Sequence, residues 1–269
     1  MNYLNSLIKF NNNLKEIRHK IREGSFTSTT SGLNPGYTQT NVAILPSQYA
    51  LDFMIFCQRN PKSCPLVEVL TPGKFEAQIS SPNSDIRTDV PKYRVFQSGK
   101  MIDEVTDILD YWSDDFVTFL LGCSFTFERA LIDSGIQLKH YDLKKNVAMY
   151  ISDINSVPSD FFSGNMVVSM RWIQNQDIEK AIETTKKYPS MHGEPIHIGD
   201  PEKIGISDIS KPDFGDFFEP DSNNYSPVFW ACGVTPQVVA LKSKIPIMIT
   251  HSPGHMFITD LKDDDFKFE

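Results

Sequence analysis

The sequence feature that most constrains the fold is a local plan that occurs twice. Cys123–Thr126 (CSFT) and Cys232–Thr235 (CGVT) each follow an apolar run, Phe116–Leu121 in the first case and Val228–Ala231 in the second, and each precedes a helical pattern. Apolar runs of this length are typical of buried strands. We therefore predict that each thiol lies between the end of a strand and the start of a helix. The repetition indicates an internal duplication or two halves that face one pocket; coincidence between two strand-to-helix turns is the alternative.

A loop with two histidines follows the second copy. A helix that opens at Thr235-Pro236 is followed by a short apolar strand, Ile247–Thr250, and by the polar loop His251–His255 (HSPGH). Ligands of open α/β sheets bind where strands end, and a helix N-terminus lowers the pKa of a thiol. We therefore expect both cysteines and both histidines to surround one cavity.

The order of elements predicts an α/β protein with two parts. Residues 1–145 and 217–269 form a mixed-sheet α/β body that carries the cysteines and the histidine loop. Residues 146–216 form a smaller inserted α+β subdomain, because their pattern is strand, strand, helix, strand. Its expected elements are Val147–Ile151, Met166–Arg171, Gln176–Lys187 and Pro195–Ile198.

Several further elements follow from periodicity. The apolar positions between Leu4 and Ile21 predict an amphipathic helix that ends at Gly24. The acidic tail, Asp260–Glu269, is expected to be a solvated end. Other expected elements are a helix over Gln48–Arg59 and strands over Val42–Leu45, Leu66–Leu70 and Tyr93–Phe96.

Composition narrows the class of protein. The 269 residues carry a formal net charge of −8 with scattered Lys and Arg, so a nucleic-acid partner is not expected. No apolar run is long enough for a transmembrane helix. The four cysteines are too dispersed for a disulfide scaffold and indicate reduced thiols in a cytoplasmic protein. Cys57 and Cys64 are expected to pack in the core, with a metal pair as the less favoured alternative.

The late histidines leave two interpretations open. His192, His197, His251 and His255 could bind a metal together with Asp200 or Asp260, or they could act in acid–base chemistry and hydrogen bonding. The sequence lacks both a Gly-rich phosphate loop and a G-x-S-x-G serine elbow.

A charged loop supplies candidate carboxylate-binding residues. Asp85, Arg87 and Lys92 lie within the turn-rich segment Ser80–Lys92. Arg87 suits bidentate contact with a carboxylate, and loops often carry binding groups. The alternative is a surface ion-pair cluster, which would contribute little.

The chain resembles the D-glutamate cyclase family, whose bacterial members are commonly labelled hydro-lyases. The resemblance extends over nearly the whole chain beyond the N-terminal helix. Lys187, where the family pattern leads us to expect arginine, and the Ser/Thr run Thr27–Ser31 depart from it. The matching stretches are Pro35–Gln39, Asp85–Tyr93, Leu121–Glu128, His192–Pro201, Phe229–Gln237 and Thr250–Phe257.

The resemblance implies that water is removed from D-glutamate to give 5-oxo-D-proline, or that a related small carboxylate reacts. In that chemistry Arg87 or Lys92 could hold the α-carboxylate, and His251 or His255 could take the proton of the amine. Glu128 could act as the acid if burial raises its pKa, and backbone N–H groups after either cysteine could stabilise an oxyanion. Either thiol could instead form a thioester. The candidate catalytic residues are Cys123, Glu128, Cys232, His251 and His255; the candidate substrate-binding residues are Asp85, Arg87, Lys92, Thr126, Thr235, His192 and His197.

Two other classes of function remain open. Two opposed cysteines also suit a cofactor-independent amino-acid racemase, and a non-enzymatic small-carboxylate binding protein is the third possibility. No cofactor is expected, although a divalent metal such as manganese is a possible requirement. The expected partner is a small carboxylate rather than a nucleic acid or a membrane, and a homo-oligomer is possible.

Overall fold

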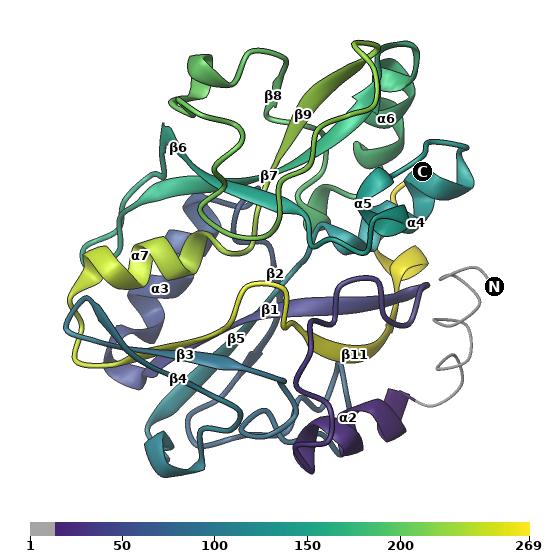
Figure 1. Cartoon of the computed structure of the whole chain (residues 1–269). Coiled ribbons are helices and arrows are strands. Elements are labelled where there is room, and N and C mark those ends of the chain that lie inside the picture. The colour runs from purple at the N-terminus through teal and green to yellow at the C-terminus, as the bar shows by residue number, and fades with distance from the viewer. Residues whose placement is uncertain (1–13) are drawn as a thin grey trace.

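The computed structural model describes residues 14–269, and these residues form two antiparallel sheets with helices around them (Figure 1). The α/β class is therefore confirmed, while every strand pairing within the described residues is antiparallel. The first part of the expected N-terminal helix lies outside the described residues, and the rest is α2 (Leu14–Arg22). No helix in residues 14–269 has the length and apolar character needed to span a bilayer.

The larger sheet has seven strands. Their order is β2-β5-β1-β10-β3-β4, with β11 as an additional partner of β1. Its strands are β1 (Tyr37–Pro46), β2 (Leu66–Leu70), β3 (Tyr93–Gln97), β4 (Lys100–Val105), β5 (Phe116–Leu121), β10 (Met248–His251) and β11 (Phe257–Lys262). Helices α3 (Ser47–Arg59) and α7 (Thr235–Ser243) lie together on one side of the molecule (Figure 1).

The smaller sheet has four strands in the order β6-β7-β9-β8. Its strands are β6 (Ala148–Asn155), β7 (Asn165–Gln174), β8 (His197–Ile198) and β9 (Tyr225–Ala231). The remaining helices are α4 (Phe125–Asp133), α5 (Lys139–Asp142) and α6 (Ile178–Thr185). Strand β9, placed in the body from the sequence, is hydrogen bonded to β7 and β8 in this second sheet.

The core packs against both faces of the larger sheet. Phe53 and Phe56 of α3 meet Phe119 of β5 on one face, and Phe53 and Phe119 contact edge to face with ring centroids 4.9 Å apart. Burying each such ring stabilises the fold by roughly 1.5–3 kcal/mol. Cys57 and Cys64 belong to this cluster, as expected for packing cysteines.

The chain end differs from its expected solvated state. Residues 257–262 form β11, which pairs with β1, and the following Asp263 is buried. The Thr38 hydroxyl donates a hydrogen bond to the Asp263 carboxylate over 3.0 Å. Burial raises the pKa of Asp263 to about 7, against the smaller effect of that hydrogen bond.

Candidate active site

The two cysteine turns pack on one asparagine. Asn41 of β1 donates a 2.6 Å hydrogen bond from Nδ2 to the Gly122 carbonyl, just before Cys123. A Cβ atom at Gly233, next to Cys232, would lie only 1.9 Å from the same Nδ2. The first turn follows β5 of the larger sheet and the second follows β9 of the smaller sheet, so turns from both sheets meet at Asn41.

Both thiols are protonated at neutral pH. Burial raises the pKa of Cys123 to about 12 and that of Cys232 to about 11. Hydrogen bonds from the backbone N–H groups of Phe125 and Val234, and the charge of Arg171, act in the opposite direction but are weaker. The expectation of a lowered thiol pKa at a helix N-terminus is therefore wrong, because desolvation outweighs it.

A buried ion pair lies beside the thiols. Arg171 of β7 donates from Nε to Glu128 Oε1 over 2.7 Å, and both side chains are fully buried. The guanidinium also donates to the hydroxyls of Ser124 and Ser169 at 2.9 and 2.8 Å. The charge of Arg171 acts on the pKa of both cysteines, so this ion pair and the thiols form one electrostatic unit.

Glu128 is ionised at neutral pH, so it has no proton to donate as a general acid. Burial alone would raise its pKa, but Arg171 and then His140, whose Nε2 lies 3.2 Å from Oε1, lower it to about 2. The condition for the general-acid role, a raised pKa, is not met. Glu128 instead neutralises Arg171.

The histidine loop begins next to this centre. The N–H of Val42, the neighbour of Asn41, donates to His251 Nδ1 over 3.2 Å. The Val42 carbonyl lies farther from Nδ1, at 3.5 Å, so we assign the proton of the neutral ring to Nε2. This buried Nε2 has no hydrogen-bond partner within residues 14–269. Burial lowers the pKa of His251 to about 3. His251 therefore offers an N–H donor and is a poor base.

His255 has the opposite arrangement. Its Nδ1 lies 3.0 Å from the Pro253 carbonyl, which assigns the proton to Nδ1 and leaves Nε2 as an acceptor. Burial lowers its pKa below the usual 6.5, so the ring is neutral at pH 7. Lys92 and Glu104 act on this pKa, which places the expected carboxylate-binding Lys92 in the same region.

Arg87 and Asp85 are occupied with each other. Arg87 donates from Nε and Nη2 to the two Asp85 oxygens at 2.8 and 2.7 Å, and its guanidinium stacks on Phe75 at 3.8 Å. None of the contacts of either residue within the described chain involves a cysteine or histidine of the predicted site. The structure therefore does not bring these two residues to the thiols.

Two predicted binding residues support the cysteine turns. The Thr235 hydroxyl donates to the Cys232 carbonyl over 2.7 Å and accepts from the Val167 N–H, so it holds the turn. His192 is buried with Nδ1 2.6 Å from the Lys62 carbonyl, and the Gly122 backbone is close enough to act on its pKa. Burial lowers the pKa of His192 to about 4, so it is neutral.

The last two predicted binding residues are His197, which lies in β8, and Thr126, which ends the first cysteine turn. His197 packs its ring against Phe229 and places Nε2 2.7 Å from the Asp200 carbonyl. Thr126 lies beside Asp263 and lines a charged cavity of about 720 Å³. No three His, Cys, Asp or Glu side chains in residues 14–269 are grouped as metal ligands.

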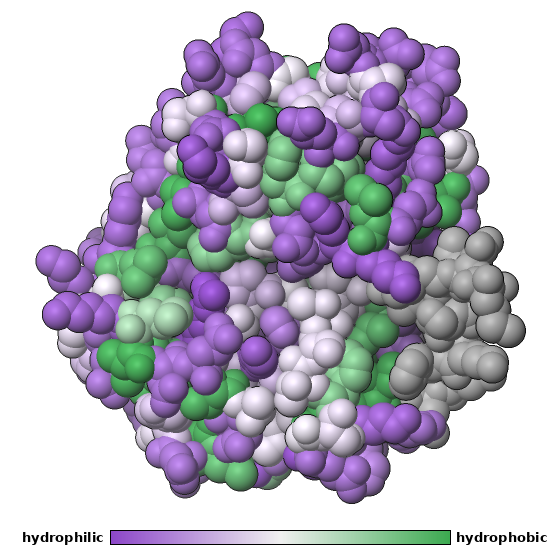
Figure 2. Space-filling model, in the orientation of Figure 1, coloured by the Kyte–Doolittle hydropathy of each residue, from purple (hydrophilic) through white to green (hydrophobic). Residues whose placement is uncertain are grey.

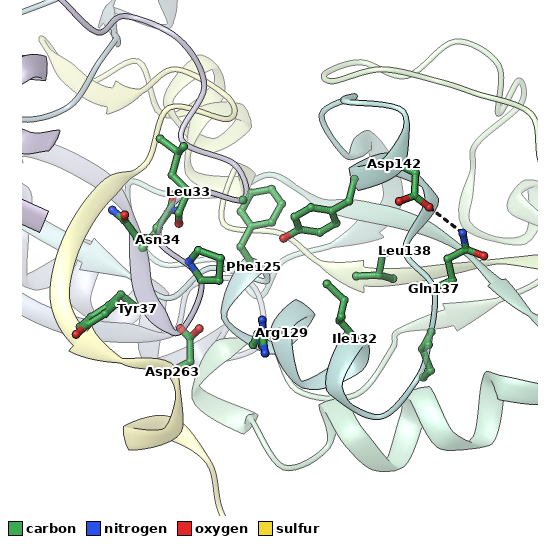
Figure 3. Close-up of a pocket in the computed structure, with 15 residues that line it drawn as sticks. Leu33, Asn34, Tyr37, Phe125, Arg129, Ile132, Gln137, Leu138, Asp142 and Asp263 are labelled. Atoms are coloured by element: carbon green, nitrogen blue, oxygen red, sulfur yellow. Dashed lines mark hydrogen bonds between the residues drawn. The ribbon is translucent and has the colours of Figure 1, made fainter. Parts of the chain in front are cut away.

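A second, mostly apolar cavity of about 340 Å³ adjoins α4 (Figure 3). Leu33 and Phe125 lie on one side of it, with Ile132 and Leu138 opposite. Neither of these two cavities is lined by a predicted catalytic residue among those described. Each cavity does adjoin the first cysteine turn, because Phe125 lines one and Thr126 lines the other.

Asn41 and Arg171 were not singled out from the sequence. Arg171 is the one charged residue of a mostly apolar stretch (VVSMRWI), and Asn41 follows three polar residues and precedes the apolar run Val42–Leu45. A charged residue within a buried strand requires a partner. That signal points to Arg171, whereas nothing local distinguishes Asn41.

The match to a family model spans both cysteine turns and the histidine loop. A family model described as D-glutamate cyclase matches residues 117–260. A Thermoanaerobacter sp. (strain X514) protein named "Putative hydro-lyase" is 54% identical over 254 residues, covering 94% of this chain and 96% of its own. A Geobacillus kaustophilus protein of the same description is 52% identical, covering 93% and 95%. A solved nitrogen repressor-like protein from Methanococcus jannaschii aligns over 90% of this chain and 96% of its own, with 12% identity and a TM-score of 0.38. The chain belongs to the D-glutamate cyclase family.

Proposed function

We propose that this protein is a hydro-lyase that closes D-glutamate to 5-oxo-D-proline, or removes water from a related small carboxylate. The family and the names of the relatives support the reaction class. The observation that carries the proposal is the meeting of both cysteine turns on Asn41, beside His251, whose Nε2 has no hydrogen-bond partner among the described residues.

The reaction joins the neutral amine nitrogen of the substrate to the carbon of its protonated γ-carboxyl group and releases the γ-hydroxyl, with one further proton, as water. The nitrogen loses a proton to His255 Nε2, which is unprotonated at pH 7. The developing oxyanion accepts hydrogen bonds from His251 Nε2–H and from the backbone N–H groups of the cysteine turns. The departing oxygen takes a proton from Cys232, which regains one from His255. Protonated thiols suit this transfer better than thioester formation, which requires a thiolate.

Incubation of the purified protein with D- and L-glutamate and with simple hydroxy acids tests this function. The expected result is a product lighter by one water from D-glutamate, with NMR signals of 5-oxoproline, at a rate proportional to enzyme concentration. Parallel reactions with and without manganese measure any metal requirement. Absence of a dehydrated product from every substrate would contradict the hydro-lyase assignment.

A racemase is the second candidate, because the two cysteine turns pack on one residue and Cys232 acts on the pKa of Cys123. One thiol would remove the α-proton and the other would return a proton. Deuterium incorporation at the α-carbon in heavy water, without ring closure, would favour this function. Tight carboxylate binding without either reaction would favour a binding protein.

A further inference from the structure

The larger sheet carries an ion cluster beside the histidine loop. Arg94 of β3 lies opposite Glu104 of β4 and donates from Nε to its Oε2 over 3.1 Å. Lys92, two residues before Arg94, places Nζ 3.7 Å from Glu104 Oε1, and the Ser252 hydroxyl donates to Oε2 over 2.9 Å. Two cations thus share one carboxylate, which leaves an excess of one positive charge.

The cluster is joined directly to the proposed catalytic residues. Arg94 Nη1 donates to Gln237 Oε1 over 3.2 Å, and Gln237 Nε2 donates to the His251 carbonyl over 2.8 Å. His255 follows three residues after Ser252 in the same loop. A ligand held by Arg94 would therefore lie beside the base rather than in either cavity near α4.

Arg94 retains unused hydrogen-bonding capacity and is accessible. Its Nη2 has no hydrogen-bond acceptor within residues 14–269, and its side chain is 23% exposed while that of Lys92 is 37% exposed. Figure 2 shows hydrophilic and intermediate residues across the middle of the face where the two sheets meet in Figure 1. Phe214, which pairs with Met149 of the smaller sheet, lies 5.7 Å from the guanidinium.

We propose that Arg94 and Lys92 bind the α-carboxylate of the substrate, with Glu104 and Gln237 orienting the guanidinium. A planar guanidinium and an ammonium together recognise a carboxylate through charge-assisted hydrogen bonds. In an α-amino acid the amine and the α-carboxylate share one carbon, so this placement brings the amine to His255. The role replaces that expected for Arg87, whose donors are taken by Asp85.

The identity of the ligand rests on the proposed function, but the carboxylate site can be tested without turnover. Calorimetry with 5-oxo-D-proline and its neutral amide, 5-oxo-D-prolinamide, isolates the contribution of the carboxylate. Glutarate and D-2-hydroxyglutarate serve as further carboxylate probes. Arg94→Gln should weaken binding of each carboxylate bound by the wild type by about 10- to 100-fold, the range of charge-assisted hydrogen bonds, and leave amide binding unchanged.

Two variants control for loss of structure. Arg94→Lys keeps the charge beside Glu104 and should give an intermediate loss because it lacks the planar fork. Arg129→Gln removes an arginine that pairs with Asp133 on its own helix, and should change no affinity. Far-ultraviolet circular dichroism and the melting temperature check that each variant is folded.

The outcomes separate this inference from the proposed function. Arg94-dependent binding of glutarate without formation of 5-oxoproline would support the site and remove the cyclase assignment. Production of 5-oxoproline by Arg94→Gln with unchanged KM and carboxylate affinity would keep the enzyme and overturn the site. A wild-type protein that binds none of the carboxylates, or an Arg94→Gln variant that loses acid and amide equally, would also overturn it.

Discussion

Replacing Glu128 by glutamine should destabilise the protein strongly at neutral pH. The pKa of Glu128 falls from an ordinary 4.5 to about 2, because Arg171 and His140 outweigh the effect of burial. That difference corresponds to about 3 kcal/mol of folding free energy above pH 5. Glutamine also leaves the fully buried Arg171 without a counter-charge, which typically costs 3–5 kcal/mol, roughly the same magnitude.

Urea unfolding at a series of pH values measures this effect. The stabilisation by a carboxylate with a lowered pKa is present above the unfolded pKa of about 4.5 and is lost as pH falls through about 2. Glu128→Gln should therefore unfold more easily at pH 7 and show a flatter pH dependence between pH 4.5 and 2. The double variant Glu128→Gln/Arg171→Met should recover part of the loss, since it no longer buries an unpaired charge. A Glu128→Gln variant within 1 kcal/mol of wild type, on the order of a surface substitution, would refute the buried ion pair.

Three further changes test neighbouring features. Gly233→Ala should lower kcat by roughly 100-fold, the scale of a 1 Å misplacement, because the added Cβ would displace Asn41. The control Gly164→Ala should retain kcat, because its Cβ would meet only a valine methyl at 3.1 Å and two backbone atoms of the same valine at 3.5 Å. His251→Asn should remove much of the stability loss between pH 6.5 and 3, because burial keeps that ring neutral in the folded state and acid therefore favours the unfolded state. If the unfolding free energy of the variant, measured in urea, falls with pH as steeply as that of wild type, this reasoning is contradicted. Asp263→Asn should raise the free energy of unfolding at pH 8 by about a few kcal/mol and have little effect near pH 4, because the carboxyl ionises in the folded state only near pH 7. Equal stability of variant and wild type at pH 8 would exclude the raised pKa.

The local elements were largely predictable because their signals are local. The apolar run Phe116–Leu121 forms β5 with the expected bounds, and α7 begins at Thr235, one residue earlier than expected, with Pro236 in its first turn. Strand β11 could not be predicted from the sequence, because half of its residues are polar and its pairing with β1 depends on the tertiary fold. Strand β4 is similarly polar and is defined by its pairing with β3.

The cysteines and histidines of the candidate site could be predicted from the sequence, but the directions of their pKa shifts could not. The turns at Cys123 and Cys232 are visible in sequence, whereas Asn41 joins them from 82 and 191 positions away. The direction of the thiol pKa shifts depends on burial in the tertiary fold, which no local pattern reveals. The division into residues 1–145 plus 217–269 and 146–216 remains a prediction, as do the oligomeric state and the absence of a cofactor.

Steady-state turnover of D-glutamate by wild type, Cys123→Ser and Cys232→Ser tests most directly whether the reaction takes place where the cysteine turns meet. We expect Cys232→Ser to lose most of kcat while its KM and melting temperature stay near those of wild type, and Cys123→Ser to lose less. Wild-type kcat in both folded variants would show that the reaction, whatever its product, does not use this centre.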